Sequence, residues 1–182
     1  MGTLKTDNQN SPFPEVSTFL FDPHLDFRGA WQRIWDLDSI RAVGHNPKIE
    51  QVSISTNPQA HTLRGMHSLK PEASEFKAVI CLTGAVQDVL IDVRPNSPTW
   101  GTYASFVLDA KYLNGVLIPP GFAHGFLTLA AETRLLYLMS VKYDAALENN
   151  FCWNDPEFAI EWLSTPTLIS EKDSTTPWIS SR

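Results

Sequence analysis

TLRGMHSLKPEASEFK, residues 62–77, reads as two short strands joined by a polar loop, and it brings Arg64, His67 and Lys77 close together in the chain. A histidine between two cations does not suit an apolar core, where charged side chains are rarely buried without a partner. The same set suits proton abstraction from carbon, because a fixed cation stabilises the negative charge that results. Strict alternation sends Arg64 and His67 to opposite faces, whereas a β-bulge at Gly65 turns both toward one cavity.

Outward from this stretch, short apolar or alternating segments recur between turns that contain Gly and Pro. Besides 62–67, the sequence predicts strands over residues 16–21, 49–55, 76–82, 85–93, 102–108, 116–118, 125–129 and 134–141. A short helix is predicted over 37–43, with Asp36 or Asp38 as its N-cap and Gly44 after its end. About nine short strands with little helix predict an all-β sandwich or jelly-roll barrel with short peripheral helices.

The length and charge of the chain limit its domain organisation and its partners. With 182 residues it forms one domain over 16–182, preceded by a polar N-terminal arm, residues 1–15, that is predicted to be flexible. A net charge of −6 and a pI near 5.3 argue against nucleic acid or an anionic membrane as the main partner. A local basic pocket for a phosphorylated small molecule remains compatible with that charge.

The N-terminal sequence and the cysteine content indicate the cellular compartment in which the protein is expected. The chain has no N-terminal apolar run typical of a signal peptide and no stretch of about 20 apolar residues that would span a membrane. A disulfide between Cys81 and Cys152 is possible, but a chain of this size does not need one. A reducing cytoplasm is therefore the expected location.

Two further residues are ambiguous on their own. His124 lies in PPGFAHGF, residues 119–126, and is either a hydrogen-bonded core histidine or a pocket residue. Tyr137 shares a strand face with Leu135 and Met139, so it is either a core aromatic residue or a phenol in the barrel interior that gives a proton.

The strand 49–55 has one polar face, which carries Gln51, Ser53 and Ser55 and indicates a strand that lines a cavity. A metal centre is not expected there, because the five histidines of the chain contain no His-x-His pair. A redox cofactor is not expected either, since a base, a cation and an acid suffice for proton transfer at carbon.

Several motifs follow one another in a characteristic order, together with Tyr137 and Tyr143. They are DFRG (26–29), LRGMH (63–67), EFK (75–77), GAVQDVLIDVR (84–94), SPTWG (97–101), IPPGFAHGF (118–126), WNDP (153–156) and ISEKD (169–173). In this order they resemble the dTDP-4-dehydrorhamnose 3,5-epimerase family. The resemblance implies a homodimeric cupin-type jelly roll. It also implies inversion of C3, C5 or both in a nucleotide-linked 4-keto-6-deoxy sugar, for deoxysugar or surface-polysaccharide synthesis.

The resemblance also assigns roles by position. His67 corresponds to the catalytic base and Asp173 to the carboxylate paired with it. Lys77 corresponds to the cation near the C4 oxygen, and Tyr137 to the acid on the opposite face of the sugar. The expected substrate contacts are Arg64, His124, Glu148, Lys172, Tyr143 stacked on the base, Arg28 reaching in from the partner subunit, Gln51, Ser53, Trp31 and Arg33.

Other functions remain open at this level. Ser68-Leu69, Ser53 and Arg33 depart from the family pattern at substrate-facing positions, which leaves the base and the sugar undetermined. A ketoisomerase of the same fold would move the carbonyl between C3 and C4, but it needs no proton from the opposite face, so Tyr137 argues against it. A non-catalytic sugar-nucleotide binding module and a metal-dependent cupin are the remaining alternatives.

Overall fold

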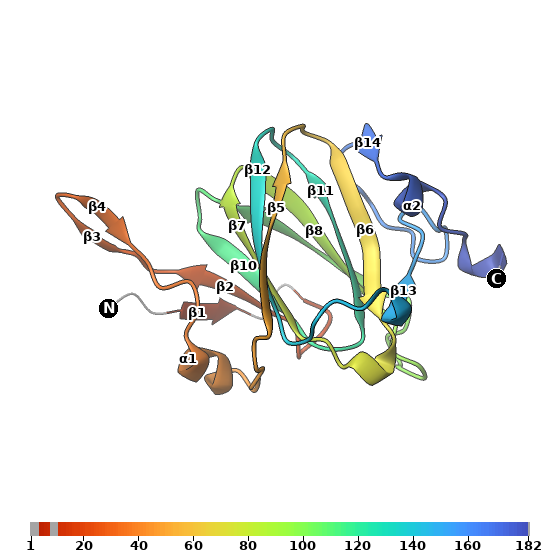
Figure 1. Ribbon diagram of the computed structural model, residues 1–182, viewed down its shortest axis with the longest axis horizontal. Coiled ribbons are helices and arrows are strands. Elements are labelled where there is room, and N and C mark those ends of the chain that lie inside the picture. Colours follow the sequence, from red (N-terminus) through yellow and green to blue (C-terminus); the bar gives the residue numbers. More distant parts are fainter. Residues whose placement is uncertain (1–3, 8–10, 182) are drawn as a thin grey trace.

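The computed structural model describes residues 4–7 and 11–181, which form two β-sheets packed face to face (Figure 1). The first sheet has the spatial order β1 (Leu4–Asp7), β2 (Ser17–Phe21), β10 (Asn114–Ile118), β7 (Lys77–Thr83), β12 (Thr133–Met139) and β5 (Gln51–Asn57). The second has the order β13 (Glu148–Asn150), β6 (Thr62–Leu69), β11 (Phe122–Thr128), β8 (Ala85–Asp92) and β9 (Tyr103–Asp109), with β14 (Leu168–Ile169) parallel to β6. The predicted all-β jelly-roll fold is confirmed.

Short helices and one hairpin surround the two sheets. The helices are α1 (Leu37–Ala42), α2 (Glu171–Ser174), and the single 3₁₀ turns η1 (Pro71–Ala73), η2 (Ala145–Leu147) and η3 (Ile179–Ser181). As predicted, Asp36 caps α1, because its side chain accepts a hydrogen bond from the Ser39 backbone. The hairpin of β3 (His24–Asp26) and β4 (Gly29–Trp31) projects away from the barrel in Figure 1. Among the described residues, no helix is long and apolar enough to cross a membrane.

Both faces of the first sheet bury apolar side chains, as β7 illustrates. Val79 and Cys81 point between the sheets, where they belong to the interior cluster. Ala78 and Ile80 point to the outer face, where they share a second cluster with Ile40 of α1. This double burial explains why β7 is apolar at nearly every position instead of alternating.

The outer face of the second sheet is covered by the chain that follows β13. Val89 and Ile91 of β8 pack in a third cluster with Phe151 and Phe158 from that C-terminal segment. Phe151 and Phe158 also meet edge to face, with ring centroids 5.8 Å apart. This packing holds the C-terminal segment against the second sheet on the way to α2.

Each of the nine predicted strands corresponds to an observed strand, with ends displaced by at most three residues. The arm predicted over 1–15 contains described structure at residues 4–7 and 11–15. Leu4–Asp7 form β1, which pairs with β2 through backbone hydrogen bonds and therefore needs no apolar pattern. Phe13 is 1% exposed and packs edge to face on Phe122, with 4.9 Å between ring centroids. Residues 1–3 and 8–10 of the predicted arm lie outside the described part.

Candidate active site

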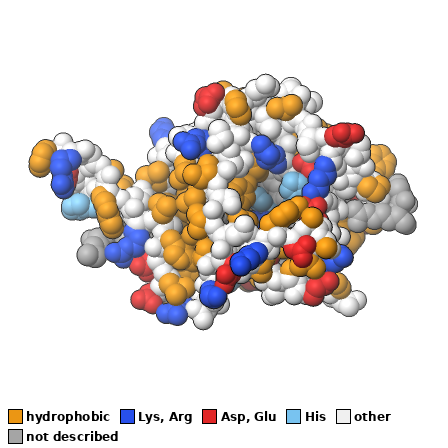
Figure 2. Space-filling view, in the orientation of Figure 1, with side chains coloured by type: hydrophobic (Ala, Val, Ile, Leu, Met, Phe, Trp, Pro, Cys, Tyr) orange, Lys and Arg blue, Asp and Glu red, His pale blue; other side chains and the backbone are white. Residues whose placement is uncertain are grey.

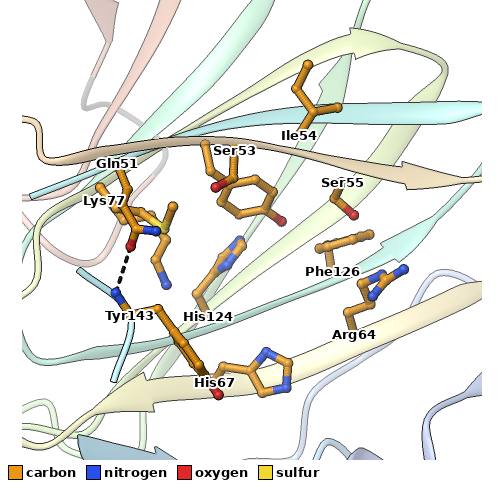
Figure 3. A pocket seen from close by; sticks show the side chains of 12 residues that line it. Gln51, Ser53, Ile54, Ser55, Arg64, His67, Lys77, His124, Phe126 and Tyr143 are labelled. Atoms are coloured by element: carbon orange, nitrogen blue, oxygen red, sulfur yellow. Dashed lines mark hydrogen bonds between the residues drawn. The ribbon is translucent and has the colours of Figure 1, made fainter. Parts of the chain in front are cut away.

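A cavity of about 480 Å³ opens between the two sheets beside β5 and β6. Figure 2 shows this hollow in the surface, with histidine side chains visible inside it. Figure 3 shows side chains from several strands converging on it. The lining residues are Gln51, Ser53, Ile54, Ser55, Arg64, His67, Lys77, His124, Phe126, Tyr137, Met139 and Tyr143. The structure thus gathers eight sequence-predicted site residues around one space.

The polar face predicted for residues 49–55 is confirmed, because Gln51, Ser53 and Ser55 of β5 all line the cavity. Ser53 is the cross-strand partner of Tyr137 on β12, so the serine and the tyrosine stand opposite each other on neighbouring strands. A small polar wall of this kind suits a ligand rich in oxygen atoms.

A bulge at Gly65 turns two side chains of β6 to the same face, as predicted. His67 pairs with His124 and Arg64 with Phe126, so two residues of β6 stand opposite Gly125 of β11 alone. Gly65 has a φ of +131°, and a Cβ atom there would lie 2.5 Å from the Cα of Gly125. Only glycine fits this close approach, and Arg64 and His67 both line the cavity as a result.

His67 forms a pair with Asp173, which lies on α2 at the far end of the sequence. Nε2 of His67 is 2.7 Å from Oδ1 of Asp173. When Asp173 is ionised, Nε2 donates to it and Nδ1 keeps its lone pair. Figure 3 shows one ring nitrogen of His67 turned toward the cavity and the other turned away from it. The ring is 41% exposed, so the free nitrogen is accessible to a ligand.

The carboxylate of Asp173 is nearly enclosed, at 4% exposure, and is well supplied with donors. Its Oδ2 accepts a hydrogen bond from the Gly65 backbone at 3.1 Å, and its own backbone N–H donates to Ser170, the N-cap of α2. Burial opposes ionisation of Asp173, but the hydrogen bonds from His67 and Gly65 outweigh it, so the pKa of Asp173 lies below its ordinary value. Asp173 is therefore a negative partner of the histidine at neutral pH.

Lys77, at the start of β7, points into the cavity as expected. Its Nζ lies 3.1 Å from Oε2 of Glu75, and both side chains are largely buried. Glu75 also lines a smaller adjoining cavity of about 190 Å³. The carboxylate fixes the position of the Lys77 ammonium group and partly offsets its charge.

His124 fulfils both of its predicted alternatives at once. It is 4% exposed and hydrogen-bonded through Nε2 to Oδ2 of Asp88 at 2.8 Å, yet it also lines the cavity. Its ring meets Tyr137 edge to face, with centroids 6.0 Å apart. Asp88 was not predicted as a site residue, because its place in the strand pattern of β8 does not indicate a contact with His124.

Tyr137 is a cavity residue with a proton that is hard to remove. Burial, and secondarily the negative charge of Asp88, raise the pKa of Tyr137 well above its ordinary value, against a smaller opposing effect of Arg64. A phenol of raised pKa stays protonated at neutral pH. Arg64 is itself held in place by a 2.8 Å hydrogen bond from its Nε to Asn57.

A network of polar contacts crosses the mouth of the cavity. Lys172 of α2 lies 2.6 Å from Oε2 of Glu148, and the hydroxyl of Tyr143 donates to Oε1 of Glu148 at 2.9 Å. The backbone N–H of Tyr143 donates to Gln51, a contact drawn in Figure 3. The hydrogen bonds from Lys172 lower the pKa of Glu148. These predicted contact residues thus lie together, already bonded to one another.

Three predicted contact residues lie elsewhere in this chain. Arg28, Trp31 and Arg33 belong to the β3–β4 hairpin and the residues just after it, and none lines the cavity. Arg28 is paired with Asp26, and Arg33 with Asp36. Within residues 4–7 and 11–181, no cluster of three or more His, Cys, Asp or Glu side chains is arranged to hold a metal ion.

Comparisons with known proteins point to one group. The model of the family described as dTDP-4-dehydrorhamnose 3,5-epimerase matches residues 10–181. A dTDP-4-dehydrorhamnose 3,5-epimerase of Mycobacterium tuberculosis is 35% identical over 159 residues, covering 85% of this chain and 78% of that protein. A dTDP-4-dehydrorhamnose 3-epimerase of Streptomyces niveus is 34% identical over 153 residues, covering 84% and 73%.

Structural similarity agrees with the sequence comparisons. A crystal structure of dTDP-4-dehydrorhamnose 3,5-epimerase from Bacillus anthracis, with TDP and PPi bound, superposes with a TM-score of 0.91 at 29% identity. The superposition covers 97% of this chain and 100% of that chain. The similarity therefore extends over both sheets and the C-terminal segment that carries α2.

Proposed function

Because the chain belongs to the dTDP-4-dehydrorhamnose 3,5-epimerase family, we propose that it inverts C3, C5 or both in a dTDP-linked 4-keto-6-deoxy sugar during deoxysugar synthesis. The observation that carries this proposal is the pairing of His67 with Asp173 in a cavity that also contains Lys77 and Tyr137. A base, a cation and an acid are what epimerisation next to a ketone requires.

The first step is removal of a proton from the carbon next to the C4 ketone. Nδ1 of His67 takes the proton, and the electron pair of the C–H bond becomes part of an enolate. Asp173 supports this step, because its carboxylate holds the Nε2 proton and stabilises the imidazolium that forms. General-base catalysis of this type typically contributes about 10²- to 10⁴-fold to the rate.

The enolate needs a positive partner, and Lys77 is the proposed one. Its ammonium group is largely buried at the cavity wall, where a charge acts through a lower effective dielectric than in water. The ion pair with Glu75 keeps the group in place before the substrate arrives, so little reorganisation is needed when charge develops on the C4 oxygen.

Inversion is completed from the other side of the sugar by Tyr137. Its phenol gives a proton to the carbon of the enolate, the C4 carbonyl re-forms, and the phenolate regains a proton from solvent. The raised pKa of Tyr137 supports this role, because a phenol that stays protonated is a donor and not a competing base. This requirement for a second proton source favours an epimerase over a ketoisomerase of the same fold.

Nucleotide binding is assigned to the mouth of the cavity. Tyr143 is 66% exposed beside the bonded pair Glu148 and Lys172, where a ring suits stacking on a base. Arg64 is the proposed cation for the diphosphate. A cytoplasmic setting is proposed because both cysteines, Cys81 and Cys152, are free thiols.

A homodimer is proposed to complete the site through the β3–β4 hairpin. Leu25, Phe27 and Trp31 are large apolar side chains on this hairpin that are exposed in the single chain, with Phe27 at 98%. Refolding the Arg28→Ala and His67→Ala variants together tests whether the hairpin of one subunit completes the cavity of the other. If Arg28 serves the partner's cavity, mixed dimers contain one intact site and regain activity. Two inactive variants that stay inactive when refolded together would show that each site is built from one chain.

The deciding experiment is solvent deuterium exchange into dTDP-4-keto-6-deoxyglucose, followed by NMR. Exchange at both C3 and C5 supports a double epimerase. Exchange at C3 alone supports the single epimerase activity named for the Streptomyces niveus relative. Failure to exchange with dTDP, CDP, UDP and GDP forms of the substrate would leave a binding module as the better explanation.

A further inference from the structure

Asp88 is a buried carboxylate at the centre of the barrel that the proposed reaction does not use. It is fully buried and lies on the interior face of β8, between Val86 and Leu90, which both belong to the apolar cluster between the sheets. A carboxylate is costly in such a place unless a partner compensates its charge. The strand does not need a carboxylate at this position to form, because the neighbouring positions on the same face are occupied by the apolar residues Val86 and Leu90.

The contacts of Asp88 differ from those of Asp173. Its Oδ2 accepts one hydrogen bond, from Nε2 of His124 at 2.8 Å, and among the described residues its Oδ1 has no hydrogen-bond partner. Asp173 instead receives donors on both oxygens, from His67 and from Gly65. Among the described residues, the His124 ring is therefore the one side chain that compensates this buried carboxylate directly.

The other groups around His124 act against its protonation. Arg64 and His67 face the same cavity from β6, Lys77 from β7 and Tyr137 from β12. The two permanent cations repel an imidazolium, and the Tyr137 phenol is neutral. Of the carboxylates in the described chain, only that of Asp88 is hydrogen-bonded to His124. Asp88 is therefore the negative group that touches His124 directly.

We propose that Asp88 is a positioning residue that keeps His124 as a fixed imidazolium, with Nε2–H on Asp88 and Nδ1–H directed to a substrate oxygen in the cavity. The proposal rests on the epimerase function given above. His124 and His67 are cross-strand partners, so the positive ring lies beside the base that creates the negative charge. The two carboxylates give the two rings opposite tasks: Asp173 serves a base that exchanges its proton, and Asp88 serves a donor that keeps it.

The protonation state of His124 can be measured without substrate. Nitrogen-15 NMR of the ring, assigned with a His124→Gln variant, is expected to show both nitrogens protonated at pH 7.5 in the unmodified protein. In Asp88→Asn the amide can still accept the Nε2–H bond, but the charge is gone, and His124 is expected to be neutral at that pH. A neutral His124 in the unmodified protein overturns the proposal, as does an imidazolium that persists in Asp88→Asn.

Kinetics supply the second readout. Asp88→Asn is expected to lower kcat for deuterium exchange about tenfold, less than full removal of a transition-state donor, with KM changed less than about twofold. Asp155→Asn is the matched control, since Asp155 is also buried, accepts hydrogen bonds from the backbone N–H groups of Glu157 and Ile179, and does not line the cavity. It is expected to leave kcat unchanged. An unchanged kcat in Asp88→Asn overturns the proposed role.

These readouts separate this proposal from the proposed function. Lack of exchange by the unmodified enzyme contradicts the epimerase assignment, whereas the nitrogen-15 NMR spectrum still reports on Asp88 and His124. If Asp88→Asn fails to fold, the spectrum of the unmodified protein at pH 7.5 decides alone.

Discussion

Two histidine–carboxylate pairs lie side by side in this cavity, and they differ in exposure and in anchoring. His67 and His124 are cross-strand partners on β6 and β11, and each is bonded through Nε2 to a carboxylate, at 2.7 Å and 2.8 Å. The His67 side chain is 41% exposed, whereas that of His124 is 5% exposed. The proposals above give the same pair chemistry two tasks, which are proton exchange for the exposed pair and a fixed charge for the buried pair.

Anchoring differs as well. Asp88 belongs to β8, an interior strand of the second sheet that is paired with β11 on one side and β9 on the other. Asp173 comes from the four-residue helix α2, held by the N-cap Ser170 and by the short parallel strand β14. If His67 is the base, we expect local opening of the C-terminal segment to disable it without unfolding the sheets. The outer pair, His67 with Asp173, therefore depends on a small element at the end of the chain. The inner pair, His124 with Asp88, depends on the sheets themselves.

Removing the base is the strongest test of the outer pair. His67→Ala is expected to reduce deuterium exchange at C3 and C5 by at least about a thousandfold, because it removes the exposed imidazole that is paired with Asp173. NMR of the sugar protons measures it. His45→Ala is the control, since His45 bonds to the Glu15 backbone outside the cavity. Wild-type exchange in His67→Ala would assign the base elsewhere.

Tyr137→Phe separates abstraction from inversion. Loss of the hydroxyl is expected to leave exchange by His67 nearly intact while lowering the rate of inverted product about a hundredfold, since the proton then returns from the face it left. Product stereochemistry by NMR distinguishes the two outcomes. Tyr103→Phe, whose hydroxyl accepts a hydrogen bond from Glu161, is the matched control outside the cavity. Equal loss of exchange and inversion would mean that Tyr137 acts before the enolate forms.

More of the outer pair than of the inner pair could be predicted from the sequence. The bulge at Gly65 and the polar face of β5 follow from alternation and from glycine chemistry, so the positions of Arg64 and His67 were predictable. The pairing of His67 with Asp173 is not local, since 106 positions separate them, and only the family resemblance suggested it. Asp88 lies within the motif of residues 84–94, but neither the motif nor the strand pattern indicated its contact with His124.

The fold shows the same limit. Strands with apolar alternation were found to within three residues, whereas β1 was missed, because an edge strand pairs through its backbone and its sequence can be polar. The two- and three-residue strands β13 and β14 were missed because they are too short to show a period. They exist because the C-terminal segment packs on β6, which is a tertiary effect.

Asp173→Asn tests the charge of the outer pair. It is expected to lower kcat about 10- to 100-fold, as loss of a residue that orients a catalytic histidine does. Because the folded-state pKa of Asp173 is lowered, its stabilising contribution is present above the ordinary Asp pKa of about 3.9 and is lost as pH falls through the lower folded value. The unfolding temperatures of the unmodified protein and of Asp173→Asn should therefore differ at pH 7 and converge below about pH 4. A constant difference across that range would assign the effect to packing.

Lys172→Met tests whether the anchoring of α2 limits the outer pair. Its ion pair with Glu148 is partly exposed, and such pairs contribute about 0.2–1 kcal/mol. The expected loss in kcat is less than about threefold, with a non-additive effect on stability when Glu148→Gln is added. Lys48→Met, which breaks an exposed pair with Glu50 outside the cavity, is the control. If Lys172→Met costs as much kcat as Asp173→Asn, the position of α2 rather than the charge of its carboxylate limits the base. The pair of His67 and Asp173 would then be the one more sensitive to local structural change, because its carboxylate comes from a helix of only four residues.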